Sequence, residues 1–129
     1  MRQVADRLPR YLALTLLPLL ALACLACGPR EFHGKDKEMM ERVGIISDAL
    51  SNYQLANAEW PESLSDVRQY LAYGERWPAN PYDGKPIADT GSPEFDPAAS
   101  VGMVFYQKLC RDDRLINYQL HVFGDKGKL

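Results

Sequence analysis

Apolar residues between positions 36 and 58 recur at steps of three and four, which is the period of an α-helix with one buried stripe. Charged and polar side chains lie mainly off that stripe. The pattern predicts a long amphipathic helix over residues 36–58, about 33 Å long at 1.5 Å per residue. Such a helix is stable only with a sheet or other helices against its stripe. The stripe consists of Met39, Met40, Val43, Ile46, Leu50 and Tyr53.

The following segment predicts a short second helix. Pro61 disfavours the α conformation at Trp60, so the long helix has to end by about residue 58. Ser63 or Ser65 can then cap a helix that runs to Leu71. We expect Trp60 to fill the core at the corner between the two helices.

Residues 73–97 hold five prolines and three glycines, which predicts an irregular but ordered loop. Residues 85–88 can form a short edge strand, where the missing N–H of Pro86 is tolerated. Four acids of this loop do not have the spacing of an EF-hand. We interpret them as solvated loop residues, and a calcium site is the alternative. The four are Asp83, Asp89, Glu94 and Asp96.

The end of the chain has the alternation of a β-hairpin. Residues 101–110 predict one strand, residues 111–114 a charged turn, and residues 115–123 the returning strand. We expect the apolar face of the second strand to lie under the long helix, and its polar face to be in water. The apolar face has Ile116, Tyr118, Leu120 and Val122, and the polar face has Asn117, Gln119 and His121. The predicted fold class is α+β, a long N-terminal helix packed on a small antiparallel β-sheet with a proline-rich loop.

The first 27 residues have the pattern of an export signal. Arg2, Arg7 and Arg10 precede a nearly continuous apolar run at residues 12–23. The apolar stretch is at most about 17 residues, shorter than the roughly 20 that a spanning helix needs. Small residues follow, which is typical of a cleaved secretory signal. Residues 28–35 form a polar tether in which His33 is a solvated residue and not a metal ligand, and residues 36–129 form the globular domain.

The cysteines at the end of this segment resemble the lipobox of bacterial lipoprotein signals. Ala21-Leu22-Ala23-Cys24 and Cys24-Leu25-Ala26-Cys27 both approach the pattern of an apolar residue, two small residues and a lipidated cysteine. Lipidation is predicted at Cys24, with Cys27 as the alternative. The resemblance implies an anchor of acyl chains such as palmitate in the cell envelope. The protein would face the periplasm or the exterior, from the outer membrane rather than the inner one. An ordinary cleaved signal and an uncleaved anchor are the other interpretations.

The charge balance and the lack of local catalytic motifs reduce the number of function classes to consider. Fifteen Lys and Arg residues stand against 17 Asp and Glu residues, with no basic patch, so nucleic acid is not an expected partner. The chain has two histidines and no local catalytic motif, and we predict no enzyme activity and no cofactor. His121 is given no catalytic role. Cys110 is either a buried free thiol or, if Cys24 carries the lipid, a disulfide partner of Cys27.

Several short motifs, taken in order, resemble the globular domain of type II secretion major pseudopilins and related type IV pilin-like proteins. The similarity covers about residues 43–128, and it implies a pilin-like fold. The first motifs are Asn52-Tyr53-Gln54, Asn57-Ala58-Glu59-Trp60-Pro61 and Leu64. The next is Asn80-Pro81-Tyr82-Asp83-Gly84-Lys85-Pro86. The last is Tyr118-Gln119-Leu120-His121-Val122-Phe123-Gly124-Asp125-Lys126-Gly127-Lys128.

The chain departs from this family at two places. Pilins and pseudopilins begin with a prepilin signal and an apolar helix with a Glu at its fifth position, whereas a lipoprotein-like signal stands here. The resemblance thus implies the fold and not filament assembly. The family's C-terminal loop binds calcium partly through an acid at the position of Lys126 in this chain. A lysine there opposes a dication, and Asp125, one place earlier, is the one calcium candidate named.

These features lead to one main hypothesis and two alternatives. The first is a lipid-anchored extracytoplasmic protein with a pseudopilin-like domain that contacts protein partners in or near an envelope secretion or pilus-type system. The second is a small-ligand or calcium-binding lipoprotein module that uses the loop at residues 73–97. The third is an atypical pseudopilin subunit whose apolar N-terminus stays uncleaved.

Overall fold

The computed structural model describes residues 30–112 and 114–129, and the predicted signal region, residues 1–27, lies outside this part of the chain. The order of elements is a long helix, a short 3-10 helix and three strands. They are α2 (Gly34–Asn57), η1 (Leu64–Tyr70), β1 (Val104–Arg111), β2 (Arg114–Gly124) and β3 (Gly127–Lys128). The helix and the small antiparallel sheet confirm the predicted α+β class.

Helix α2 confirms the predicted long helix and begins two residues earlier. Its buried residues are Met39, Val43, Ile46, Ala49 and Leu50. Four of them belong to the predicted stripe, Ala49 was not predicted, and the remaining stripe residues Met40 and Tyr53 are partly buried. The helix ends at Asn57 and is capped by Ala58, whose φ of 57° is left-handed and whose N–H donates to the carbonyl of Gln54 at 2.8 Å. Trp60 and Pro61 follow at once, so the chain turns away where Pro61 predicts it.

The sheet is built around the β1–β2 hairpin. The two strands are antiparallel from Val104↔Val122 to Arg111↔Arg114, with an irregularity between Leu109 and Cys110. Strand β3 pairs only with the end of β2, so the strand order is β1-β2-β3. The hairpin was predicted correctly to within a few residues, whereas β3 was not predicted, because two residues are too few to show an alternation.

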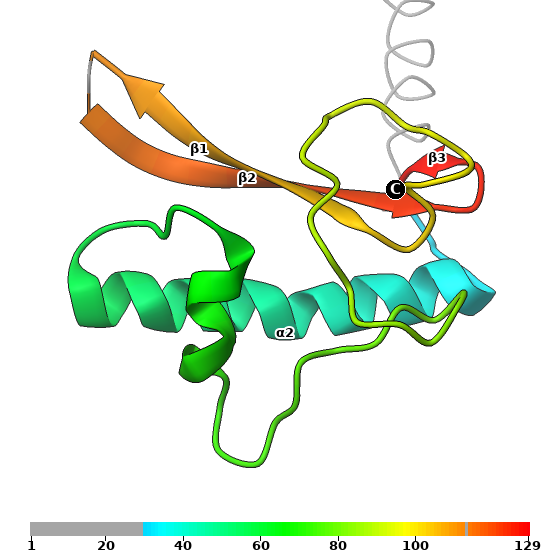
Figure 1. Cartoon of the computed structure of the whole chain (residues 1–129), viewed down its shortest axis with the longest axis horizontal. Helices are drawn as coiled ribbons and strands as arrows, with labels where there is room; N and C mark the ends of the chain where they lie inside the picture. Colours follow the sequence, from blue (N-terminus) through cyan, green and yellow to red (C-terminus); the bar gives the residue numbers. More distant parts are fainter. Residues whose placement is uncertain (1–29, 113) are drawn as a thin grey trace, which may run out of the picture. The chain divides into compact units, whose positions relative to one another are not determined.

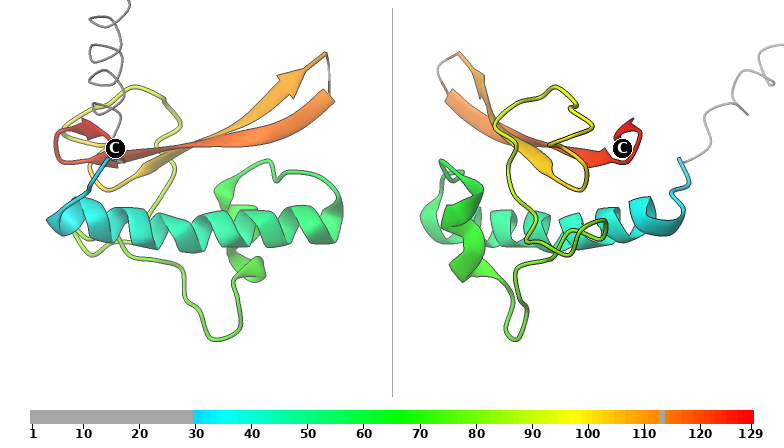
Figure 2. Two further views of the ribbon diagram at one scale, coloured as in Figure 1. Left: turned by 180° about the vertical axis from the view of Figure 1, so that it is seen from behind. Right: turned by 45° about the vertical axis from the view of Figure 1, so that its right-hand side comes forward.

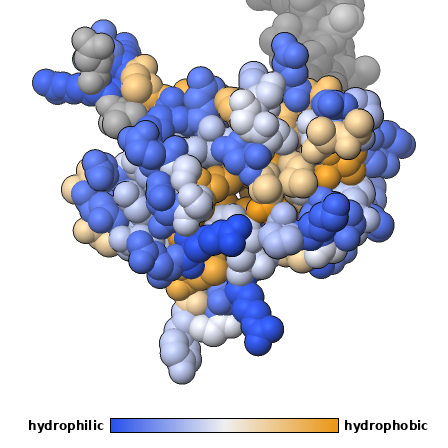
Figure 3. All heavy atoms as spheres, viewed as in Figure 1, coloured by the Kyte–Doolittle hydropathy of each residue, from blue (hydrophilic) through white to orange (hydrophobic). Residues whose placement is uncertain are grey.

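One face of the hairpin packs on α2, as Figures 1 and 2 show. Val104, Tyr106 and Val122 are buried against the helix, and Tyr118 and Leu120 are partly buried there. Tyr118, Leu120 and Val122 confirm the apolar face predicted for the second strand, and the side chain of Ile116, also predicted there, lies outside the described part of the structure. Figure 3 shows apolar side chains between the helix and the sheet and mostly polar ones around them.

The predicted second helix is present as a 3-10 helix. Leu64 and Val67 of η1 are buried, and the N–H of Ser63 donates to the Asp66 carboxylate at 3.0 Å. Trp60 is half-buried and lies against Tyr118 with ring centroids 4.7 Å apart. It therefore packs on the core from the edge instead of filling the corner completely.

The proline-rich loop is ordered by isolated contacts and contains no strand. The strand predicted at residues 85–88 is wrong, since only a single bridge joins Ala79 and Pro86. Pro86 has no N–H for a longer ladder. A parallel bridge joins Asp89 to Val104, and Ile87 between these bridges is fully buried in the core. The loop is thus held against the sheet and the core at several points.

Candidate functional site

The two candidate lipidation residues, Cys24 and Cys27, lie outside the described residues, so lipidation stays a prediction. Cys110 lies near the end of β1, where the hairpin extends past the end of the core. Its thiol is exposed, so the alternative of a buried free thiol is wrong. It forms no disulfide with any residue of 30–112 or 114–129. A bond to Cys27 remains a prediction.

The acids of the loop mostly stabilise turns. Asp83 accepts a hydrogen bond from the N–H of Lys85 at 2.9 Å, Asp89 from that of Gly91 at 2.8 Å, and Asp96 from that of Ala98 at 2.9 Å. Asp125 is exposed in the turn between β2 and β3. Among the described residues, no three His, Cys, Asp or Glu side chains gather where one metal ion could reach them.

The structure corrects the prediction for His121. Both ring nitrogens are buried and have no hydrogen-bond partner among the described residues. Phe105 of β1 meets the imidazole edge-on, with ring centroids 5.6 Å apart. On the same face Phe95 of the loop lies 5.9 Å from Phe123, which is buried. The predicted wet face is therefore covered where the loop passes over it. His33, in contrast, is exposed just before α2.

Burial sets the charge state of this histidine. Removing the imidazole from water disfavours its protonated form and lowers the pKa of His121, and the positive charge of Lys128 on β3 lowers it further. A neutral ring has one N–H and one free lone pair, and neither is satisfied here. The arrangement is costly for the fold and is most costly for a charged ring.

Asn80, the first residue of the pseudopilin-like motif Asn80–Pro86, joins this motif to the segment before β1. Its side-chain amide donates to the carbonyl of Val101 at 2.9 Å, and its side-chain oxygen accepts from the N–H of Tyr82 at 2.8 Å. Its own N–H donates to the carbonyl of Lys85 at 2.6 Å. Gly102 has a φ of +69°, and a Cβ there would overlap the Asn80 amide. The motif therefore has a structural role.

Tyr82 of the same motif ties the loop to the start of α2. Its hydroxyl donates to the Asp36 carboxylate. Burial, the hydrogen bond to Asp36 and the charge of Asp36 raise the pKa of Tyr82 well above its usual value. The phenol therefore stays protonated and donates at neutral pH.

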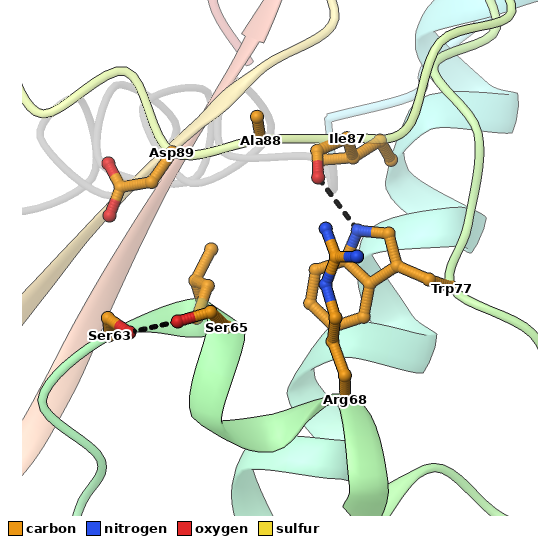
Figure 4. A pocket seen from close by; sticks show the side chains of 8 residues that line it. Ser63, Ser65, Arg68, Trp77, Ile87, Ala88 and Asp89 are labelled. Carbon is orange, nitrogen blue, oxygen red and sulfur yellow. Dashed lines mark hydrogen bonds between the residues drawn. The ribbon is translucent and has the colours of Figure 1, made fainter.

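A hollow of about 240 Å³ lies between η1 and the loop (Figure 4). The indole of Trp77 donates to the carbonyl of Ile87 at 2.8 Å, and the guanidinium of Arg68 lies 5.0 Å from the centroid of that indole. The lining residues are Ser63, Leu64, Ser65, Arg68, Trp77, Ile87, Ala88 and Asp89. Sequence reasoning missed this site, because Arg68 and Trp77 belong to different segments and no spacing joins them.

A second hollow, of about 340 Å³, lies within the loop itself, lined mainly by residues between Thr90 and Ser100. Asp96 and Ser100 close it by bonding to each other's backbone. Two large apolar side chains are well exposed elsewhere, Leu55 near the end of α2 and Tyr73 in the segment that follows η1. The described surface therefore has a hollow with a cationic wall and two exposed large apolar side chains.

Comparison with known proteins adds no relative to these observations. No helix among the described residues is both long and apolar enough to cross a membrane. No protein family, curated protein or solved structure matches the chain.

Proposed function

We propose that this protein is a lipid-anchored extracytoplasmic interaction protein with a pseudopilin-like domain. It acts through contacts with protein partners in or beside an envelope secretion or pilus-type system, and not on nucleic acid. The observation that carries the proposal is the order of the pseudopilin-like motifs over residues 43–128 behind a lipobox-like signal. The lipid would anchor the protein to the outer membrane, with the domain facing the periplasm or the exterior.

The contacts of the motif residues support a pilin-like arrangement. Tyr53 packs edge-on against Tyr70, with ring centroids 5.0 Å apart. The carbonyl of Pro61 accepts a hydrogen bond from the buried Tyr106 hydroxyl at 2.8 Å. Asn80 links the loop to the segment before β1. These contacts join α2 to η1, β1 to the segment before η1, and the loop to the segment before β1, and such links between segments support the proposal of a shared fold.

Most buried polar groups of the described residues serve the fold. Asn80 donates to the carbonyl of Val101, and Ser100 accepts from the N–H of Asp96 within its own loop. The Tyr106 hydroxyl donates to the carbonyl of Pro61. The ring nitrogens of His121 are the exception, because they are buried without a hydrogen-bond partner among the described residues. We therefore assign the proposed function to the surface of the domain.

The lipid anchor is tested by matched cysteine substitutions in the cell of origin. The wild-type protein should sediment with membranes, and Cys24→Ser should release it or leave it unprocessed, whereas Cys27→Ser should remain anchored. The reverse result would move the lipid to Cys27. If both single variants and the double variant behaved as the wild type does, the lipid anchor would be wrong.

The partner assignment needs a separate test. Cross-linking in intact cells, followed by capture from detergent-solubilised membranes, should recover components of a secretion or pilus-type system. The Cys24→Ser variant provides the control for contacts that depend on the anchor. If repeated experiments recovered no such component, the proposed association with a secretion or pilus-type system would be wrong. The proposed lipid anchor would not be affected.

A further inference from the structure

The hollow between η1 and the loop contains a pre-positioned cation. The hydrogen bond from the Trp77 indole to Ile87 fixes the ring, and the guanidinium carbon of Arg68 lies over that ring, 5.0 Å from its centroid (Figure 4). A guanidinium in this position can still donate its N–H groups to a carboxylate or phosphate in a two-pronged manner. Arg68 is therefore already placed, and binding would cost little of its side-chain freedom.

Arg68 is also without an acidic partner in the described part of the chain. The ion pairs there are Lys37–Glu41, Arg42–Glu38 and Lys108–Glu62. Arg42 is a useful comparison, because its guanidinium donates to both the Glu38 carboxylate and the carbonyl of Ala79 within the domain. The charge of Arg68 is not used in this way.

The other walls of the hollow restrict the anion. Asp89 turns its carboxylate away from Arg68 in Figure 4 and bonds the N–H of Gly91. The negative charge of Asp89 repels a dianion such as phosphate more strongly than it repels a single carboxylate. Leu64 and Ile87 are apolar and almost fully buried where they line the hollow, while Ser63 and Ser65 bring hydroxyls that bond to each other. A carboxylate on a short apolar stem complements these groups.

The size of the hollow favours a single side chain over a free metabolite as its ligand. Sites for whole small molecules are usually roughly 300–1,000 Å³, and this hollow is about 240 Å³ and open to solvent. It fits one side chain better than a complete small ligand. We propose that the hollow receives the carboxylate of a Glu or Asp side chain on a partner protein, with Arg68 as the residue that binds it. This inference deepens the proposed function and rests on it only in assigning the carboxylate to a protein.

The test is a titration of the ¹⁵N-labelled full chain in detergent micelles, followed by NMR. The probe is a short acetylated and amidated peptide of alanine and glutamate, and the matched control peptide has glutamine in place of glutamate. The indole N–H signal of Trp77 should shift and saturate with the glutamate peptide at millimolar concentration. The indole signal of Trp60, which packs on Tyr118 outside the hollow, should stay in place.

Substitutions assign the effect to one side chain. Arg68→Gln should weaken binding by about ten-fold or more, because it removes a charge-assisted pair. Arg68→Lys should bind the glutamate peptide with an affinity between those of the wild type and Arg68→Gln, because lysine keeps the positive charge but cannot form the two-pronged hydrogen bond. Arg76→Gln, at an exposed arginine in the same loop, should bind as the wild type does.

Three results would overturn the inference: equal shifts with the glutamine peptide, unchanged affinity in Arg68→Gln, or tighter binding of inorganic phosphate than of the glutamate peptide. A wild-type titration without any Trp77 shift would overturn it as well. None of these results bears on the anchor or on the secretion partners, which are tested in cells. Failure of the hollow and failure of the proposed function can therefore be told apart.

Discussion

Asn80 is a polar side chain in the core, and its amide joins the loop to the residues before β1. It is fully buried, and its side chain and N–H make three hydrogen bonds to Val101, Tyr82 and Lys85. Removing the amide leaves the Val101 carbonyl and the Tyr82 N–H without these partners, and unsatisfied buried groups cost more than the bonds themselves. At the residue scale, Asn80 is the most sensitive polar position of the described domain.

Asn80→Ala should therefore lower the free energy of unfolding by about 3 kcal/mol. Asn117→Ala, at an exposed position on β2, is the matched control and should change it by less than about 0.5 kcal/mol. Urea denaturation followed by circular dichroism measures both. Equal, small effects of the two substitutions would show that the Asn80 contacts contribute little.

His121 makes stability depend on pH. Its pKa is lowered in the folded protein, so the unfolded chain takes up a proton first as the pH falls below about 6.5. Stability from this residue is thus complete above pH 6.5 and falls as the pH drops toward the folded pKa. The slope reaches at most about 1.4 kcal/mol per pH unit for one group.

Replacing the imidazole removes this dependence. His121→Phe should flatten the unfolding free energy between pH 7.5 and about 5.5, because Phe cannot take up a proton. His33→Phe, at the exposed histidine before α2, should keep the wild-type slope. Chemical denaturation at a series of pH values measures the three proteins. A wild-type slope in His121→Phe would assign the dependence to other groups.

At the scale of elements, α2 is the part on which the rest of the domain packs. Its stripe meets η1 and the apolar face of the hairpin, and Ile46 in the middle of the stripe is fully buried. The loop adds Ile87 to the same core. Loss of volume at Ile46 should therefore weaken the contacts of several elements at once.

Ile46→Ala should lower the free energy of unfolding by about 2–5 kcal/mol, which is the usual range for a buried Ile. Leu55→Ala, on the same helix, is the control, because Leu55 is 79% exposed and should contribute less than about 0.5 kcal/mol. Thermal and urea unfolding measure the pair. A similar cost at both positions would contradict the packing of α2 described above.

The elements with a repeating pattern could be predicted from the sequence. Apolar residues at steps of three and four predicted α2, and the alternation in residues 115–123 predicted β2 and the face that it turns to the core. Both predictions were possible because burial of one side of an element produces a periodic pattern of apolar residues. Residues 85–88 were predicted wrongly as a strand because they have a suitable composition but only one bridge to pair with.

The contacts of the candidate site could not be predicted from sequence periodicity. Alternation assigns His121 to the face away from α2, but it cannot tell that the loop with Phe95 crosses that face. Likewise, Arg68 and Trp77 meet only because the loop returns past η1. Such contacts depend on the path of an irregular segment, which has no period to read.

At the scale of the whole molecule, Phe32–Leu129 forms one compact unit, and the predicted lipid anchor precedes it in the sequence. The buried polar groups Asn80 and Tyr106 link the loop to the segment before β1 and β1 to the segment before η1. Its surface offers a hollow with a free cation on one wall. A lipid at the N-terminus would keep such a surface at the membrane, where an envelope partner can meet it.

The central claim is the lipid anchor, and intact mass spectrometry of the protein purified from the membranes of its own cell tests it most directly. We predict a mass that begins at Cys24, or at Cys27 in the alternative, plus an acylated glyceryl group. An unmodified full-length mass would contradict the account, because the apolar N-terminus would then remain on the mature protein and an atypical pseudopilin subunit would become the better interpretation.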